Sequence, residues 1–321
     1  MKVDTDFVMS INGEAVTTEH TLPVFNPATR SVFAQVPDAS KAQLDATVAG
    51  AQQAFAGWSQ TPVDQRQAAL ERFADLLEEN AEELMTLLTA EQGKPRAGTE
   101  WEVFGSATWL RAIATQRLPD EQVEETDERR VVTRFTPVGV VGAIVPWNFP
   151  ILLAIWKIAP ALMAGCTVVL KPSPYTPLCD LKMVELAQQA FPPGVLNAIS
   201  GGDDLGKWMT SHPDINKIAF TGSTETGRHV MRSAADTIKR VTLELGGNDP
   251  AIVLPDVDAK AIAPELFWAA FQNNAQFCNA TKRLYIHEDV YDEVRDALVE
   301  FIASNIKVGD GNEADLSLIH I

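Results

Sequence analysis

Residues 138–150 read VGVVGAIVPWNFP, and this stretch decides the fold that we expect. It is a short apolar run, divided by Gly and ended by Pro, of the kind that forms a buried strand. Helical stretches such as 178–190 and 224–235 alternate with further runs of the same kind. Those runs are CTVVLKPS (166–173), GVLNAIS (194–200), INKIAFTGS (215–223), RVTLELGG (240–247) and PAIVLPDVD (250–258). The alternation predicts βαβ units, and therefore an α/β fold with a doubly wound parallel sheet.

The residues before this region have a different pattern of apolar and polar side chains. Residues 44–55, 63–92 and 99–113 repeat apolar side chains at helical spacing, so we expect surface helices with one buried face. Residues 119–134 are acidic and show no period until a strand-like stretch at 131–135. We interpret this acidic segment as an excursion between two parts of one domain.

Residues 150–170 have the length and hydropathy of a membrane span. However, Lys157 and Pro160 lie in the interior of this stretch, and β-branched residues crowd its end. We therefore predict a buried helix followed by a buried strand, and no membrane as a partner.

The composition is ordinary for a globular protein and excludes a disordered or fibrous chain. The chain has 321 residues, 46% of them hydrophobic and 21% charged, so two or more domains are expected. A formal net charge of -17 argues against a nucleic-acid partner, because phosphate binding needs a basic surface. The first twenty residues lack an apolar signal segment, and three cysteines without framework spacing favour a reducing compartment. We expect a cytoplasmic protein.

Polar residues follow four of the predicted strands, at the edge where an α/β sheet binds its ligands. The four endings are Pro146-Trp147-Asn148, Lys171-Pro172-Ser173, Thr221-Gly222-Ser223 and Glu244-Leu245-Gly246-Gly247. Each ending is a weak signal when taken singly. GSTETG at 222–227 could receive a phosphate at a helix N-terminus, or it could be a plain strand-to-helix turn. Lys171 could be a surface lysine, Asn148 a turn residue and Glu244 a solvated strand end.

Residues 271–283 read FQNNAQFCNATKR and resemble the cysteine signature of the aldehyde dehydrogenase superfamily. LELGGNDP at 243–250 resembles the glutamate signature of that family, and Glu244 precedes Cys278 by 278 − 244 = 34 residues, a separation similar to that of ordinary members. PWNFP, KPSPYTP and FTGSTETG match other landmarks of the family in order, at 146–150, 171–177 and 220–227. The resemblance runs from about residue 11 to residue 311.

The resemblance implies NAD(P)-dependent oxidation of a small-molecule aldehyde to a carboxylic acid. Cys278 is the implied nucleophile, because an aldehyde carbon can release hydride only after a nucleophile has added to it. The Asn148 amide and the Cys278 backbone N–H would hold the oxyanion of the thiohemiacetal. Glu244 would deprotonate the water that hydrolyses the resulting thioester.

The resemblance also implies a binding site for NAD or NADP, with NAD favoured. The implied cofactor-binding residues are Ile144, Pro146, Trp147, Lys171, Ser173, Gly202, Gly222, Ser223, Gly227 and Leu245. We expect no metal, because none of the five histidines forms a pair with ligand spacing. We expect structural roles for Cys166 and Cys179.

The implied domains follow the family. Residues 1–114 and 138–247 would form the Rossmann-like dinucleotide-binding domain, 115–137 a small oligomerisation arm, and 248–321 the start of an incomplete α/β catalytic domain. We expect the full-length parent to be a homodimer or homotetramer.

Three departures from the family pattern qualify these expectations. The family usually has Gly where this chain has Ala275, and NAD-preferring relatives often have Glu where this chain has Pro174. Members are roughly one and a half times as long, and residues 315–321 (DLSLIHI) do not match the pattern. Two alternatives therefore stay open: a coenzyme A-acylating relative, and a truncated dinucleotide-binding fragment without activity.

Overall fold

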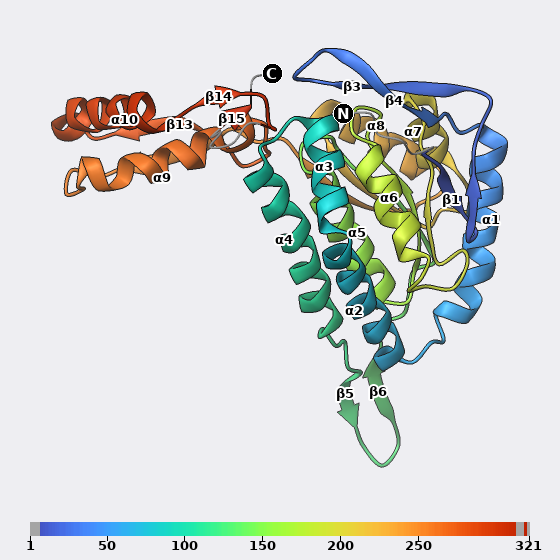
Figure 1. The fold of residues 1–321 in the computed structure, drawn as a ribbon. Helices are drawn as coiled ribbons and strands as arrows, with labels where there is room; N and C mark the ends of the chain where they lie inside the picture. Colours follow the sequence, from blue (N-terminus) through green and yellow to red (C-terminus); the bar gives the residue numbers. More distant parts are fainter. Residues whose placement is uncertain (1–6, 313–317, 320–321) are drawn as a thin grey trace.

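A seven-stranded sheet forms the centre of the computed structural model, which describes residues 7–312 and 318–319 (Figure 1). The strand order is β11-β10-β7-β8-β9-β1-β2. The five parallel strands are β7 (Val140–Ile144), β8 (Thr167–Lys171), β9 (Leu196–Ala198), β10 (Lys217–Gly222) and β11 (Arg240–Leu245). β1 (Met9–Ile11) is antiparallel to both of its neighbours, β9 and the edge strand β2 (Glu14–Val16). The predicted doubly wound parallel sheet is confirmed.

The order of the parallel strands creates a crevice beside β7. The chain moves outward from β7 to β8 and β9, and then returns to place β10 and β11 on the other side of β7. The connections after β7 and after β9 therefore diverge, and the carboxyl ends of β7 and β10 border the point where α/β proteins bind ligands. In this register Ile144 lies opposite both Lys171 and Phe220, and Thr221 lies opposite Glu244.

Helices cover both faces of the sheet. One face packs against α1 (Lys41–Trp58), α7 (Asp203–Ser211) and α8 (Thr224–Ala235). The other packs against α5 (Pro150–Met163) and α6 (Leu178–Ala187), outside which lie α2 (Val63–Glu79), α3 (Ala81–Gln92) and α4 (Arg96–Ala114). Successive residues of a pleated strand point to opposite faces of the sheet, so they pack in two different hydrophobic cores. Val168 and Leu170 belong to one core, and Val169 belongs to the other.

Two helical expectations can be compared with the structure directly. The stretch at 150–170 is a buried helix followed by a buried strand, as predicted, and no helix in the described part of the chain is long and apolar enough to cross a membrane. The run at 63–92 is two helices instead of one. Asn80 separates them with a non-helical φ of -113°, and its side-chain amide donates to the Leu76 carbonyl oxygen at 2.8 Å.

Two hairpins lie outside the main sheet. The first pairs β3 (Thr21–Asn26) with β4 (Ser31–Pro37). The second pairs β5 (Glu121–Glu125) with β6 (Arg130–Thr133) and projects from the body of the molecule at the bottom of Figure 1. The sequence indicated the strand near 131–135 but not its acidic partner β5.

The C-terminal lobe extends to the left of the main sheet in Figure 1. It contains β12 (Asp249–Val253), α9 (Ala259–Phe271), β13 (Thr281–Ile286) and α10 (Tyr291–Asn305), with the short helices η1 (Gln272–Ala275) and η2 (Glu288–Val290) and the pair β14 (Val308–Gly309) and β15 (Leu318–Ile319). The run at 250–258 thus supplies a strand that pairs with β13 in a separate two-stranded parallel sheet. Of the atypical segment 315–321, all but residues 318–319 lie outside the described residues.

Candidate active site

Cys278 lies exposed in the loop between η1 and β13. Three successive residues before it, Asn273, Asn274 and Ala275, have left-handed backbone conformations with φ of 48°, 54° and 61°. Such conformations are unfavourable for residues with a Cβ atom, and least so for Asn. The departure from the family at Ala275 therefore falls where the backbone favours glycine.

Residues 272–280, which comprise η1 and the segment with Cys278, are called the cysteine loop below. The Asn148 side chain reaches this loop from the main sheet. Asn148 lies between the end of β7 and the start of α5, and its Nδ2 donates to the Gln276 carbonyl oxygen at 2.8 Å. Gln276 is two residues before Cys278. The amide implied as an oxyanion donor is thus in direct contact with the loop that carries the implied nucleophile.

The glutamate signature also contacts the cysteine loop. A Cβ atom added at Gly247 would lie 2.7 Å from the Cys278 carbonyl oxygen, whereas one added at Gly246 would meet nothing within 4 Å. Only a residue without a side chain allows this close approach. Glu244 itself is exposed on β11, three residues before the contact. The structure thus brings the sequence segments of Asn148, Glu244 and Cys278 to one place.

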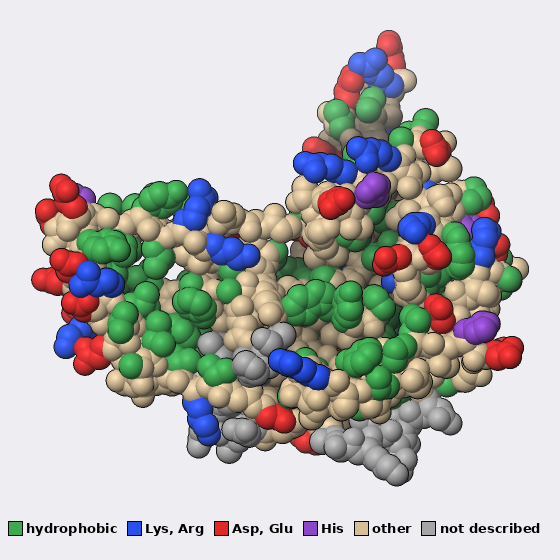
Figure 2. All heavy atoms as spheres, turned by 90° about the horizontal axis from the view of Figure 1, so that it is seen from above, with side chains coloured by type: hydrophobic (Ala, Val, Ile, Leu, Met, Phe, Trp, Pro, Cys, Tyr) green, Lys and Arg blue, Asp and Glu red, His purple; other side chains and the backbone are tan. Residues whose placement is uncertain are grey.

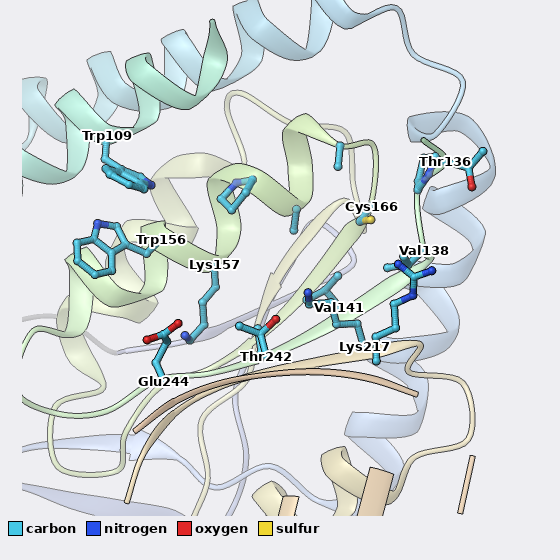
Figure 3. Close-up of a pocket in the computed structure, with 16 residues that line it drawn as sticks. Trp109, Thr136, Val138, Val141, Trp156, Lys157, Cys166, Lys217, Thr242 and Glu244 are labelled. Atoms are coloured by element: carbon cyan, nitrogen blue, oxygen red, sulfur yellow. The ribbon is translucent and has the colours of Figure 1, made fainter. Parts of the chain in front are cut away.

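Lys157 and Glu244 line a cavity of about 420 Å³, and the Lys157 side chain ends beside the Glu244 carboxylate (Figure 3). It is buried on α5, and its ammonium donates to Thr221 Oγ1 at 2.6 Å. Burial lowers the pKa of Lys157 to about 8, although the Glu244 carboxylate opposes this shift. Sequence reasoning treated Lys157 only as an interruption of an apolar run. A charge in such a run was itself a signal, because a buried lysine needs polar partners.

A second cavity, of about 490 Å³, lies at the carboxyl ends of β7, β8 and β10. Ile144, Lys171 and Ser173 line it together, as the implied cofactor site requires, and so does Pro174. Lys171 is buried and not a surface lysine, and burial lowers its pKa to about 8. Its ammonium has room for a ligand hydroxyl, since its one hydrogen bond in the described structure, to the Pro172 carbonyl oxygen, is long at 3.3 Å.

The other implied cofactor residues surround the same edge without lining this cavity. Ser223 is the N-cap of α8, and its hydroxyl accepts from the Thr226 backbone N–H at 3.1 Å. This contact fits a plain strand-to-helix turn as well as a phosphate site. Of the remainder, Gly222 ends β10, Gly202 is the N-cap of α7, Gly227 packs in α8 against Leu245 of β11, and Pro146 and Trp147 link β7 to α5.

The remaining cysteines are buried, and Cys166 lines the cavity that Lys157 and Glu244 also line. Burial raises the pKa of Cys179 well above its usual range, and Cys166 lies next to β8. Among residues 7–312 and 318–319, no three His, Cys, Asp or Glu side chains gather as metal ligands.

The molecule is hollowed between the C-terminal lobe and the main body, and apolar side chains gather along this hollow (Figure 2). Hydrogen bonds at the junction include those from Asn148 Nδ2 to the Gln276 carbonyl oxygen and from Arg283 Nε to the Asn248 carbonyl oxygen, the latter at 3.0 Å.

The strand order and the crevice define a doubly wound α/β protein of the Rossmann type. The profile described as "Aldehyde dehydrogenase family" matches residues 15–318, and the chain therefore belongs to the aldehyde dehydrogenase family. The family assignment made from the sequence motifs is confirmed.

Known relatives agree with this assignment. The chain is 45% identical to aldehyde dehydrogenase LUC3 of a Fusarium species over 296 residues, which cover 92% of this chain and 63% of that protein. It is 42% identical to phenylacetaldehyde dehydrogenase of Pseudomonas fluorescens, covering 95% and 64% of the two chains. The NAD⁺ complex of an aldehyde dehydrogenase from Bacillus cereus superposes with a TM-score of 0.94 at 38% identity, covering 98% and 66%. The chain thus spans slightly less than two thirds of the length of these relatives.

Proposed function

We propose that this chain carries the cofactor site and the nucleophile of an NAD(P)-dependent aldehyde dehydrogenase that releases its product by hydrolysis. The observation that carries the proposal is the contact of two separate segments with the cysteine loop. Asn148 Nδ2 binds the Gln276 carbonyl oxygen, and Gly247 approaches the Cys278 carbonyl oxygen. An amide donor, a carboxylate and an exposed thiol are the groups that this chemistry needs.

The first step is addition of the Cys278 thiolate to the aldehyde carbon. The sulfur–carbon bond forms, and the carbonyl electron pair moves to oxygen, where the Asn148 amide and the Cys278 backbone N–H stabilise the charge. Bound NAD(P)⁺ supplies the hydride acceptor. The oxygen lone pair re-forms the carbonyl group as hydride leaves, so Cys278 then carries a thioester.

The second step is hydrolysis of this thioester. Glu244 takes a proton from water, the water oxygen adds to the carbonyl carbon, and the carbon–sulfur bond breaks to regenerate the Cys278 thiolate. A coenzyme A-acylating enzyme needs no such base, so the presence of Glu244 favours the hydrolytic reaction.

The proposed cofactor is NAD or NADP, held in the cavity that Ile144, Lys171 and Ser173 line. Pro174 lines this cavity where NAD-preferring relatives often have Glu, so no carboxylate at this position repels a 2′-phosphate. We expect both cofactors to bind in calorimetric titrations. Pro174→Glu should raise the dissociation constant of NADP⁺ at least tenfold more than that of NAD⁺. Equal weakening of both would contradict this role for position 174.

The test of the reaction uses a panel of aliphatic and aromatic aldehydes with NAD⁺ or NADP⁺ and without coenzyme A. We expect NAD(P)H to form with unaltered protein, none with Cys278→Ala, and a burst followed by slow turnover with Glu244→Gln. Persistent turnover in Cys278→Ala would exclude the thiohemiacetal mechanism. NAD(P)H that appears only with coenzyme A would favour the acylating alternative, and cofactor binding without any NAD(P)H would favour the inactive fragment. A cytoplasmic location and a homodimeric or homotetrameric parent belong to the same proposal.

A further inference from the structure

A buried lysine lies behind the proposed oxyanion-binding amide. Lys94 follows α3, is 2% exposed, and forms an ion pair with Glu102 of α4. Its Nζ also donates to the Asn148 backbone carbonyl oxygen at 2.9 Å and lies 3.9 Å from the centre of the Phe149 ring. The last two contacts place the ammonium at the junction of β7 and α5.

The carboxylate of Glu102 fixes the other side of this junction. While Oε2 binds Lys94, Oε1 accepts from the Leu152 backbone N–H at 3.2 Å, in the first turn of α5. Unpaired N–H groups in the first turn of a helix favour a carboxylate partner. Lys94 and Glu102 therefore hold the two ends of the short segment that begins at Asn148.

The cysteine loop contacts the same carbonyl oxygen. Asn273 Nδ2 donates to the Asn148 carbonyl oxygen at 3.3 Å, and Asn273 Oδ1 accepts from Gln92 Nε2 at 3.2 Å. Gln92 Oε1 in turn accepts from the Lys94 backbone N–H at 2.9 Å. One carbonyl oxygen thus receives a donor from the segment after α3 and a donor from the loop before Cys278.

Fold stability alone does not explain this arrangement. Removing both charges from water is costly, and well-packed apolar pairs often replace buried ion pairs without loss of stability. Here the polar contacts beyond the pair are directed to the backbone that carries Asn148. A backbone held from both sides fixes the direction of its side chain, and small displacements of catalytic groups reduce rates strongly.

We propose that Lys94 is a positioning residue for the oxyanion site: by holding the Asn148 carbonyl oxygen, it directs the Asn148 amide to the cysteine loop. The inference rests on the proposed function, because it assumes that Asn148 stabilises an oxyanion formed at Cys278. Lys94 itself does not touch the reacting atoms in this scheme.

The test compares Glu102→Gln with the double variant Lys94→Met, Glu102→Gln. In both variants the glutamine keeps an acceptor for the Leu152 N–H. The double variant has neither charge of the pair, whereas Glu102→Gln keeps the Lys94 ammonium. The two variants therefore differ only in the Lys94 side chain. Lys182→Met, which removes a partly exposed lysine from ion pairs with Glu83 and Glu185, is the remote control.

Two readouts on the 321-residue chain separate positioning from general damage. Addition of Cys278 to a dimethylaminocinnamaldehyde breaks the conjugation of the carbonyl group, so loss of absorbance reports the adduct and requires the oxyanion site. Alkylation of Cys278 by iodoacetamide requires the thiolate but no oxyanion site. We expect the double variant to bind the aldehyde at least about tenfold more weakly than Glu102→Gln, with an alkylation rate close to that of Glu102→Gln. Its melting temperature should be no lower than that of Glu102→Gln, because it lacks the lone buried ammonium that Glu102→Gln keeps.

Two results would overturn the inference. The first is equal aldehyde affinity in the two variants. The second is a parallel fall in adduct formation, alkylation rate and melting temperature in the double variant, which would mean that Lys94 only stabilises the fold. If unaltered protein forms no adduct although iodoacetamide reacts, the proposed function fails. The inference about Lys94 is then decided by a crystal structure of the double variant. We expect Asn148 Nδ2 to leave the Gln276 carbonyl oxygen, and an unchanged contact would overturn the inference.

Discussion

Ala275 holds the least favourable backbone conformation in the cysteine loop. Its φ of 61° places a methyl group in the left-handed region, which costs roughly 1–2 kcal/mol for an L-residue. We expect Ala275→Gly to raise the free energy of unfolding by about 1 kcal/mol, since glycine adopts this conformation without the clash but loses more chain entropy. Urea unfolding followed by circular dichroism measures the change.

A helical alanine provides the matched control for this substitution. Ala49 is exposed within α1, so Ala49→Gly should lower the free energy of unfolding by about 1 kcal/mol. If Ala275→Gly destabilises the protein as Ala49→Gly does, the loop is not strained at Ala275, and the departure from the family at this position has no energetic consequence there.

The two glycines after Glu244 should respond differently to the same substitution. A methyl group at Gly247 would lie 2.7 Å from the Cys278 carbonyl oxygen, so either the turn or the cysteine must move. A methyl group at Gly246 would enter open space. We therefore expect Gly247→Ala to reduce aldehyde oxidation at least tenfold, because a displacement near 1 Å can cost about that much or more. Gly246→Ala should stay within about twofold of unaltered protein. Similar rates for the two variants would show that the contact does not position Cys278.

At the scale of elements, the sequence predicted those with strong local signals. The helix expected at 224–235 is α8 with the same bounds, because Ser223 caps a periodic segment directly after a strand. β1, β2 and β5 were missed, since three to five residues carry too little periodicity and β5 is almost entirely polar. The contact of Lys94 with Asn148 joins residues 54 positions apart, and only the packing of α4 on α5 creates it.

Helix α5 should give the protein a pH dependence through Lys157. Its folded-state pKa of about 8 lies below the ordinary value of 10.5, so the unfolded chain binds the proton more tightly between these values. Stability must then rise with pH across this window, as the penalty for the buried ammonium is relieved. Relative to Lys157→Met, unaltered protein should gain up to about 3 kcal/mol between pH 8 and 10.5.

The comparison needs denaturant unfolding of both proteins at several pH values. Lys171 titrates in the same range but is present in both proteins, so its contribution cancels in the difference. Below pH 8 the difference should be constant. A constant difference up to pH 10.5 would mean that Lys157 keeps an ordinary pKa, and that the ammonium facing Glu244 is solvated.

At the scale of the whole molecule, the proposed site depends on how two bodies meet. Asn148 and Glu244 belong to the edge of the main sheet, whereas Cys278 belongs to the C-terminal lobe. The hydrogen bonds of Asn148 with Gln276 and of Gln92 with Asn273 join these bodies beside the thiol. The proposed chemistry therefore depends on the relative position of the main sheet and the C-terminal lobe.

The projecting β5–β6 hairpin is where a second copy of the chain should bind. A two-stranded ribbon alone is marginally stable, and this one exposes Val123 at 61% and Val131 at 41% although it touches no core cluster among the described residues. We expect unaltered protein to be dimeric or tetrameric in light scattering. Val123→Asp with Val131→Asp should give monomers with an unchanged melting temperature for the main body, because both side chains lie outside its cores. Val32→Asp, on exposed β4, should leave the mass unchanged. An unchanged mass in the double variant would remove the hairpin from the interface, and monomeric unaltered protein would contradict the role of residues 115–137 in this chain.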